Sequence, residues 1–122
     1  MSEKIILVVD DDPSVIQILS NLLRPKFRVK VATRGAQAIG IAASPPQPDL
    51  ILLDVLMPDM DGYEVCDKLK NFPDTSRIPV IFVTGNASPE EKQRGLELGG
   101  VSYLTKPLDP EEVLSKIKAI IG

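Results

Sequence analysis

Short apolar runs alternate along the chain with longer segments in which apolar residues recur at helical spacing. The short runs predict five β-strands, over Lys4–Val9, Phe27–Ala32, Asp49–Leu53, Pro79–Val83 and Val101–Leu104. Three of these strands contain continuous apolar stretches rather than an alternating pattern, at Ile5–Val9, Leu50–Leu53 and Val80–Val83. A continuous stretch is typical of a strand that is buried on both faces. The pattern therefore predicts a parallel sheet with helices on each side.

The segments between and after these strands carry the signals that begin helices. Four of them open with a capping residue, at Asp12-Pro13, Asp61-Gly62, Ser88-Pro89 and Asp109-Pro110. Proline is tolerated in a first turn because its missing N–H has no helical partner there. Glu91 and Glu112 stand three residues after two of the caps, which predicts reciprocal capping boxes. The Ala-rich segment Gly35–Ala43 supplies the fifth helix.

Five βα units joined by right-handed crossovers predict a single α/β domain, 1–122, with a doubly wound, five-stranded parallel sheet. A chain of 122 residues is long enough for one domain with a real core. The proline-rich connector Ser44–Pro48 is too short to separate two domains. In a sheet of this kind, ligands bind beyond the carboxyl ends of the strands, at the point where the strand order reverses.

Composition and charge exclude several kinds of chemistry. The chain has no histidine, which rules out His-dependent catalytic triads and His-ligated zinc. Its net charge of −3 gives no electrostatic reason for this domain to bind nucleic acid or an anionic membrane. The apolar run Ile5–Val9 is too short for a signal peptide or a membrane span, and the single cysteine, Cys66, fits a reducing compartment. We therefore expect a cytoplasmic protein.

One basic cluster is formed by Arg24, Lys26, Arg28 and Lys30, which are spaced by two. On a strand this spacing puts the charges on one face, and a charged face protects an edge strand from pairing with other chains. We favour this interpretation over the alternative of a binding patch.

Polar side chains concentrate where the predicted strands end. Asp10 and Asp11 follow the first strand, Asp54 the third and Thr84 the fourth, and Lys106 comes shortly after the fifth. Neighbouring carboxylates repel one another unless a cation lies among them, and hard oxygen ligands suit Mg²⁺. Each residue alone has a simpler interpretation as a loop, turn or surface residue. Together, a metal, a lysine and a hydroxyl around one carboxylate indicate a phosphoryl-transfer site.

Four short motifs surround these residues in a fixed order: Leu7-Val8-Val9-Asp10-Asp11-Asp12, the segment 48–62, Val83-Thr84-Gly85 and Tyr103-Leu104-Thr105-Lys106-Pro107. In order and spacing they resemble the receiver domains of two-component response regulators, of the kind found in chemotaxis. The resemblance extends over essentially the whole chain. It implies the flavodoxin-like (βα)5 fold with strand order 2-1-3-4-5.

The resemblance also implies a role for each polar residue. Asp54 is expected to accept a phosphoryl group from the phosphohistidine of a sensor histidine kinase or phosphotransfer protein. Asp11 and Asp54 are expected to bind Mg²⁺ directly, Asp10 largely through water, and Leu56 through its main-chain carbonyl. Lys106 is expected to pair with the phosphoryl oxygens and to precede a cis peptide bond to proline. Such a chain is a signalling switch that catalyses only its own phosphorylation and slow dephosphorylation.

The resemblance implies that Thr84 donates its hydroxyl to the phosphoryl group, and that Tyr103 turns inward as a companion switch residue. The surface of the fourth helix, fifth strand and fifth helix would then change. An output domain, a downstream protein or a second copy of the chain could read this change. Without Thr84, Tyr103 would be interpreted as a half-buried aromatic residue. Leu56 and Asn86 occupy positions that tune phosphoryl lifetime in the family, and an apolar Leu56 predicts slow dephosphorylation.

Three alternative functions explain less of the sequence. A phosphohydrolase of the haloacid dehalogenase type needs a second aspartate two residues after the nucleophile, where this chain has Leu56. A calcium loop aligned on Gly62 would place Met57 and Lys68 at ligand positions, which neither can fill. The third alternative is a receiver-like interaction module that is never phosphorylated, for which a broken pocket would be expected.

Overall fold

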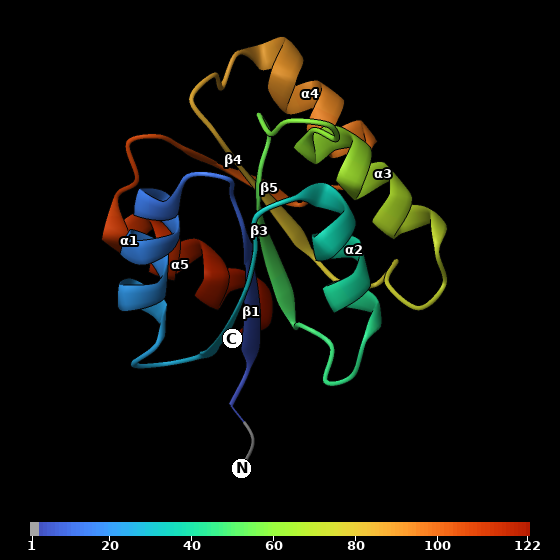
Figure 1. Ribbon diagram of the computed structural model, residues 1–122. Coiled ribbons are helices and arrows are strands. Elements are labelled where there is room, and N and C mark those ends of the chain that lie inside the picture. Colours follow the sequence, from blue (N-terminus) through green and yellow to red (C-terminus); the bar gives the residue numbers. More distant parts are fainter. Residues whose placement is uncertain (1–2) are drawn as a thin grey trace.

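The computed structural model describes residues 3–122 and consists of alternating strands and helices (Figure 1). The strands are β1 (Ile5–Val9), β2 (Arg28–Ala32), β3 (Leu50–Asp54), β4 (Val80–Thr84) and β5 (Ser102–Thr105). The helices are α1 (Pro13–Leu23), α2 (Gly35–Ala43), α3 (Gly62–Asn71), α4 (Pro89–Glu97) and α5 (Pro110–Ile121). All five strands and all five helices were predicted from the sequence.

The five strands form one parallel sheet in the order β2-β1-β3-β4-β5. The predicted fold class and strand order are therefore confirmed. The order reverses between β1 and β3, because the chain first moves outward to β2 and then crosses back to β3. The register pairs Val9 with Leu53 across this point, which brings the carboxyl ends of β1 and β3 side by side. This is where ligands bind in doubly wound sheets.

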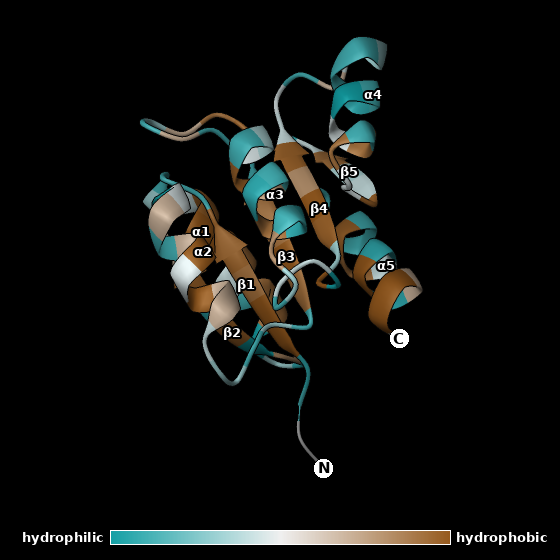
Figure 2. Ribbon diagram, turned by 90° about the vertical axis from the view of Figure 1, so that its right-hand side faces the viewer, coloured by the Kyte–Doolittle hydropathy of each residue, from teal (hydrophilic) through white to brown (hydrophobic). Residues whose placement is uncertain are grey.

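Two helical layers cover the sheet. Helices α1 and α5 lie on one face and α2, α3 and α4 on the other (Figure 1). Alternate strand residues supply the two cores: Leu7 and Leu53 belong to the cluster under α2 and α3, whereas Ile6 and Leu52 belong to the cluster under α1 and α5. Figure 2 shows the apolar strands enclosed between helices whose outer faces are largely hydrophilic. The continuously apolar strands are thus buried on both faces, as predicted.

The predicted helix caps are present. The side chains of Asp12, Asp61, Ser88 and Asp109 each accept a hydrogen bond from a main-chain N–H of the first turn. The two capping boxes, in contrast, are wrong. At α4 the Ser88 N–H donates to Asn86 Oδ1 at 3.3 Å, and the Glu91 carboxylate accepts from Tyr63 instead. At α5 no return bond from the Glu112 side chain is found within residues 3–122.

The basic cluster lies only partly on a strand. Arg28 and Lys30 belong to β2, which is an edge strand as predicted. The prediction is wrong for Arg24 and Lys26, because α1 runs to its C-cap at Arg24 and the chain turns at Lys26, whose N–H donates to Leu23 O at 2.9 Å. Lys30 Nζ donates to a main-chain carbonyl at 2.6 Å. In the described part of the chain, no helix has the length and apolar character needed to cross a bilayer.

Candidate functional site

Three carboxylates meet at the carboxyl ends of β1 and β3. Asp10 follows the last residue of β1, and Asp54 is the last residue of β3. One oxygen from each of Asp10, Asp11 and Asp54 lies within 4.8 Å of the other two. Asp10 and Asp54 are buried, whereas Asp11 is exposed. An arrangement of hard oxygen ligands that is open on one side fits Mg²⁺, which keeps part of its water shell.

Lys106 reaches the same point from the loop after β5. Its Nζ lies 3.1 Å from Asp54 Oδ1 and 3.3 Å from Asp10 Oδ2. The Lys106 main-chain N–H donates to Thr84 O at 2.8 Å, which ties this loop to the end of β4. The peptide bond between Lys106 and Pro107 is cis, as predicted. The lysine and the carboxylates are therefore held in contact by the ends of three strands.

The electrostatics of this pocket work against a charged Asp54. The pKa of Asp54 is raised to about 6, chiefly by burial and next by the nearby negative charge of Asp10, while Lys106 lowers it in part. Burial also opposes the charge on Lys106, but the two carboxylates outweigh burial and raise the pKa of Lys106 above its ordinary value. A further positive charge in the pocket would stabilise the ionised Asp54.

Thr84 ends β4 on the other side of β3 from β1, and it is buried. Its hydroxyl donates to Asn86 O at 3.2 Å and accepts from the Asn86 N–H at 3.0 Å. The hydroxyl therefore bonds to its own loop. Apart from Gly85 and its two chain neighbours, no heavy atom of residues 3–122 lies within 4 Å of the point where a Cβ on Gly85 would be, so the space at this glycine is open.

The loop that follows Asp54 is closed by its backbone. The Gly62 N–H donates to Val55 O at 2.8 Å, and a Cβ on Gly62 would lie only 2.3 Å from Asp54 O. Asp59 adopts a positive φ of 70° within this loop. Leu56, whose carbonyl is a predicted metal ligand, belongs to the same loop, and its side chain is 76% exposed. The glycine is required because the chain returns so close to Asp54.

Tyr103 lies inside the molecule, on β5. Its hydroxyl donates to Glu91 O at 2.5 Å, and its ring packs against Phe82 with the ring centres 5.3 Å apart. The role of Tyr63 was not predicted from the sequence: its ring packs against Phe82, and its hydroxyl donates to the Glu91 carboxylate. Its one sequence signal is an aromatic residue directly after Asp61-Gly62, in a chain with only 4% aromatic residues.

Comparison with known sequences identifies the family of this chain. The family model for the response regulator receiver domain matches residues 6–118. A probable cyclic di-GMP phosphodiesterase of Vibrio cholerae serotype O1 is 44% identical over 117 residues, which are 96% of this chain and 26% of that protein. The chain thus spans about a quarter of the length of this relative.

Solved structures show the same similarity. Chemotaxis protein CheY4 of Vibrio cholerae is 30% identical and superposes with a TM-score of 0.92, covering 98% of this chain and 100% of that chain. The receiver domain of sensor histidine kinase PA1611 from Pseudomonas aeruginosa PAO1 is also 30% identical, with a TM-score of 0.89 and 99% of both chains covered. That structure has a magnesium ion coordinated in its active site cleft. The present chain belongs to the response regulator receiver family and is a receiver domain of two-component signalling.

Proposed function

We propose that Asp54 is the phosphoacceptor of this receiver domain, and that Asp10, Asp11, Asp54 and the Leu56 carbonyl bind Mg²⁺. Receiver domains bind Mg²⁺ in their acidic site, and the three carboxylates here provide suitable oxygen ligands. The observation that carries the proposal is the contact of Asp54 with both Lys106 and a carboxylate cluster, where the strand order reverses.

The transfer itself requires little from the protein beyond position and charge. An oxygen of the Asp54 carboxylate forms the new bond to phosphorus. The bond between phosphorus and the donor breaks, and the leaving group keeps the electron pair: an imidazole nitrogen of phosphohistidine, or an oxygen of acetyl phosphate. Bound Mg²⁺ supplies positive charge that offsets the charge on the transferring group. Lys106, with Nζ already 3.1 Å from Asp54, is placed to pair with a phosphoryl oxygen.

The signal passes through Thr84. An aspartyl phosphate adds acceptor oxygens and nearly two negative charges beside Asp54. The Thr84 hydroxyl then exchanges its bonds to Asn86 for a bond to the phosphoryl group, and the loop before α4 moves with it. Tyr103 acts as the companion residue of this switch, and the surface of α4, β5 and α5 reports the change.

Receiver domains act with histidine kinases or phosphotransfer proteins, and relatives of this chain carry further domains. We propose that this chain is cytoplasmic and that a sensor histidine kinase or a phosphotransfer protein is its phosphoryl donor. An output domain or downstream protein, or a phosphorylation-dependent homodimer, is the proposed reader of the switched surface. If this chain were instead a receiver-like interaction module that is never phosphorylated, the contact between Asp54 and Lys106 would have no chemical role.

The test is incubation with acetyl phosphate and Mg²⁺ followed by intact-mass measurement. We expect the wild-type chain to gain one phosphoryl group, and the gain to be lost in Asp54→Asn and in the presence of a chelator. Asp67→Asn, which removes an exposed carboxylate on α3, is the control and should gain the group normally. A wild-type chain that gains nothing, or an Asp54→Asn variant that gains as much, would overturn the proposal.

A further inference from the structure

Helix α4 is packed differently from the other helices. Within α4, all of which the structure describes, Gly95 is the one buried residue, and Leu96 is 49% exposed. A helix that buries no apolar stripe gains little from packing, so few contacts fix its position on the sheet. The contacts that do hold it therefore decide where it lies.

Two tyrosine hydroxyls meet at one residue of this helix. Tyr63, from α3, donates to Glu91 Oε2 at 2.6 Å. Tyr103, from β5, donates to Glu91 O at 2.5 Å, and the two hydroxyl oxygens are 3.3 Å apart. The bond from Tyr63 ends on a carboxylate and is therefore of the stronger, charge-assisted kind. Glu91 joins three elements that are far apart in the sequence.

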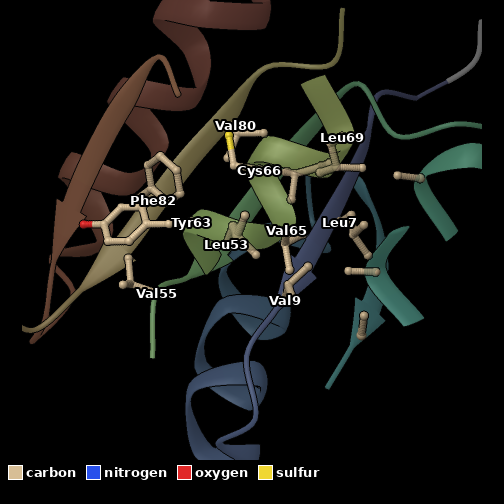
Figure 3. Packing of buried hydrophobic residues seen from close by; sticks show 14 of the residues in the cluster. Leu7, Val9, Leu53, Val55, Tyr63, Val65, Cys66, Leu69, Val80 and Phe82 are labelled. Atoms are coloured by element: carbon tan, nitrogen blue, oxygen red, sulfur yellow. The ribbon is translucent and has the colours of Figure 1, made fainter. Parts of the chain in front are cut away.

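Ring packing holds the same group together. Tyr63 and Phe82 are both buried, with their ring centres 5.1 Å apart and tilted by 58°. Figure 3 shows the Tyr63 ring beside Phe82, with its hydroxyl oxygen pointing away from the rest of the cluster. The Arg94 guanidinium lies 4.5 Å from the centre of the Tyr63 ring, a cation–π contact. Arg94 is three residues after Glu91, so α4 contacts Tyr63 at both its hydroxyl and its ring.

The inward position of Tyr103 also depends on α4. A Cβ on Gly95 would lie 1.9 Å from the Tyr103 hydroxyl oxygen. The hydroxyl therefore fits only because this residue of α4 is glycine. All of these contacts are made by groups other than Asp54, Lys106 and Thr84, so none of them requires a phosphoryl group.

The same contacts join the two loops of the reaction site. Tyr63 directly follows Gly62, which closes the loop after Asp54. Glu91 lies one turn into α4, just after the loop that begins at Thr84. The capping box predicted for Glu91 is absent because its carboxylate is bonded to Tyr63, and such local departures from sequence rules concentrate at functional sites.

We propose that Tyr63 is a positioning residue of the switch. Through Glu91 it stabilises the arrangement of α4 in which Tyr103 lies inward, so that part of the population already has this arrangement before phosphorylation. The inference rests on the proposed roles of Thr84 and Tyr103. A ligand that binds one arrangement gains apparent affinity when that arrangement is already populated. Loss of the bond between Tyr63 and Glu91 should therefore expose Tyr103 and weaken binding of a phosphoryl analogue.

The first measurement follows Tyr103 directly. Tyr63→Phe removes only the hydroxyl and keeps the ring. The wild-type chain has two tyrosines and no tryptophan, so Tyr103 is the sole tyrosine of this variant. In this variant we expect quenching of tyrosine fluorescence by acrylamide to fall about threefold when Mg²⁺ and beryllofluoride are added, because the analogue restores the inward arrangement. Equal quenching with and without the analogue would overturn the proposal.

The second measurement compares matched variants. Tyr63→Phe removes the donor of this bond and Glu91→Gln removes the negative charge of its acceptor, so each should raise the apparent Kd of beryllofluoride, by up to about tenfold. The double variant should be no worse than Tyr63→Phe alone, because both changes act on the same bond. Glu90→Gln makes the same charge change at an exposed neighbour and should leave the Kd unchanged. Equal Kd values in the wild type and all four variants, or strictly additive effects in the double variant, would overturn the proposal.

Different measurements test the function proposed for Asp54 and the positioning role proposed for Tyr63. If the wild-type chain binds no beryllofluoride, the function proposed for Asp54 fails. The positioning role is then judged by amide hydrogen exchange of α4 without any analogue. Tyr63→Phe should speed this exchange about tenfold and Glu90→Gln should not. Unchanged exchange in Tyr63→Phe would overturn it.

Discussion

The two loops that frame the pocket are held in different ways. The loop from β3 to α3 is closed by main-chain hydrogen bonds, and α3 behind it buries five residues. The loop from β4 to α4 is held by side chains, through Thr84, Asn86 and Ser88, and α4 behind it buries one. The first loop fixes Asp54, the proposed phosphoacceptor, whereas the second loop is held by side-chain bonds that can change partners. A phosphorylation switch requires this difference: the loop that carries the acceptor stays in place, and the neighbouring loop moves in response.

The largest effect should come from breaking the fixed loop with Gly62→Ala. The new Cβ would meet Asp54 O at 2.3 Å, and the backbone cannot yield without moving Asp54. We expect the free energy of unfolding to fall by about 3 kcal/mol and phosphorylation to be lost. Urea unfolding measures the first effect. Gly40→Ala, on an exposed part of α2 where a Cβ meets nothing within 4 Å, is the control and should be neutral or slightly stabilising.

The second-largest effect should come from removing the charge of Asp54, which alters the free energy of unfolding. With its pKa raised to about 6, Asp54 holds a proton in the folded chain between roughly pH 4 and 6, where the unfolded chain has released it. Stability therefore falls as the pH rises through this range. Asp54→Asn should be more stable than wild type by about 2 kcal/mol at pH 7 without divalent cations.

This gain should shrink as the pH falls below 6 and vanish near pH 4. Saturating Mg²⁺ should stabilise the wild type and reduce the difference at pH 7. Thermal unfolding at several pH values checks both expectations. A gain of the same size at pH 4 and pH 7 would show that burial of the charge is not its cause.

A smaller effect should follow from Gly95→Ala, which alters α4, the helix behind the second loop. Alanine normally stabilises a helix relative to glycine by nearly 1 kcal/mol. Here the new Cβ would lie 1.9 Å from the Tyr103 hydroxyl oxygen and push the ring outward. We expect a net loss of about 1 kcal/mol together with easier quenching of tyrosine fluorescence. A variant that is more stable, with Tyr103 still protected, would contradict the packing described for α4.

The smallest effect concerns the exposed side chain beside the acceptor. Leu56 is 76% exposed and apolar, so it cannot orient a water molecule for attack on the aspartyl phosphate. Leu56→Asn should shorten the lifetime of the phosphorylated chain about threefold, measured as the decay of the mass gain after the donor is removed. An unchanged lifetime would contradict this role.

The three inner strands, β1, β3 and β4, were predictable because continuous apolar runs leave little choice in a doubly wound sheet. The meeting of Asp10, Asp54 and Lys106 followed from one rule, that the carboxyl ends of parallel strands share an edge. The bond from Tyr63 to Glu91 could not be predicted, because it joins residues 28 positions apart and competes with a local capping box. Local rules cannot decide between a nearby partner and a distant one.

The central claim is that Asp54, and no other carboxylate of the pocket, accepts the phosphoryl group. Borohydride reduces an aspartyl phosphate to homoserine, so peptide mass mapping after reaction with acetyl phosphate and Mg²⁺ locates the modified residue. We predict homoserine at position 54 alone, and none when Mg²⁺ is omitted. Homoserine at position 10 or 11, or at no position, would contradict the account.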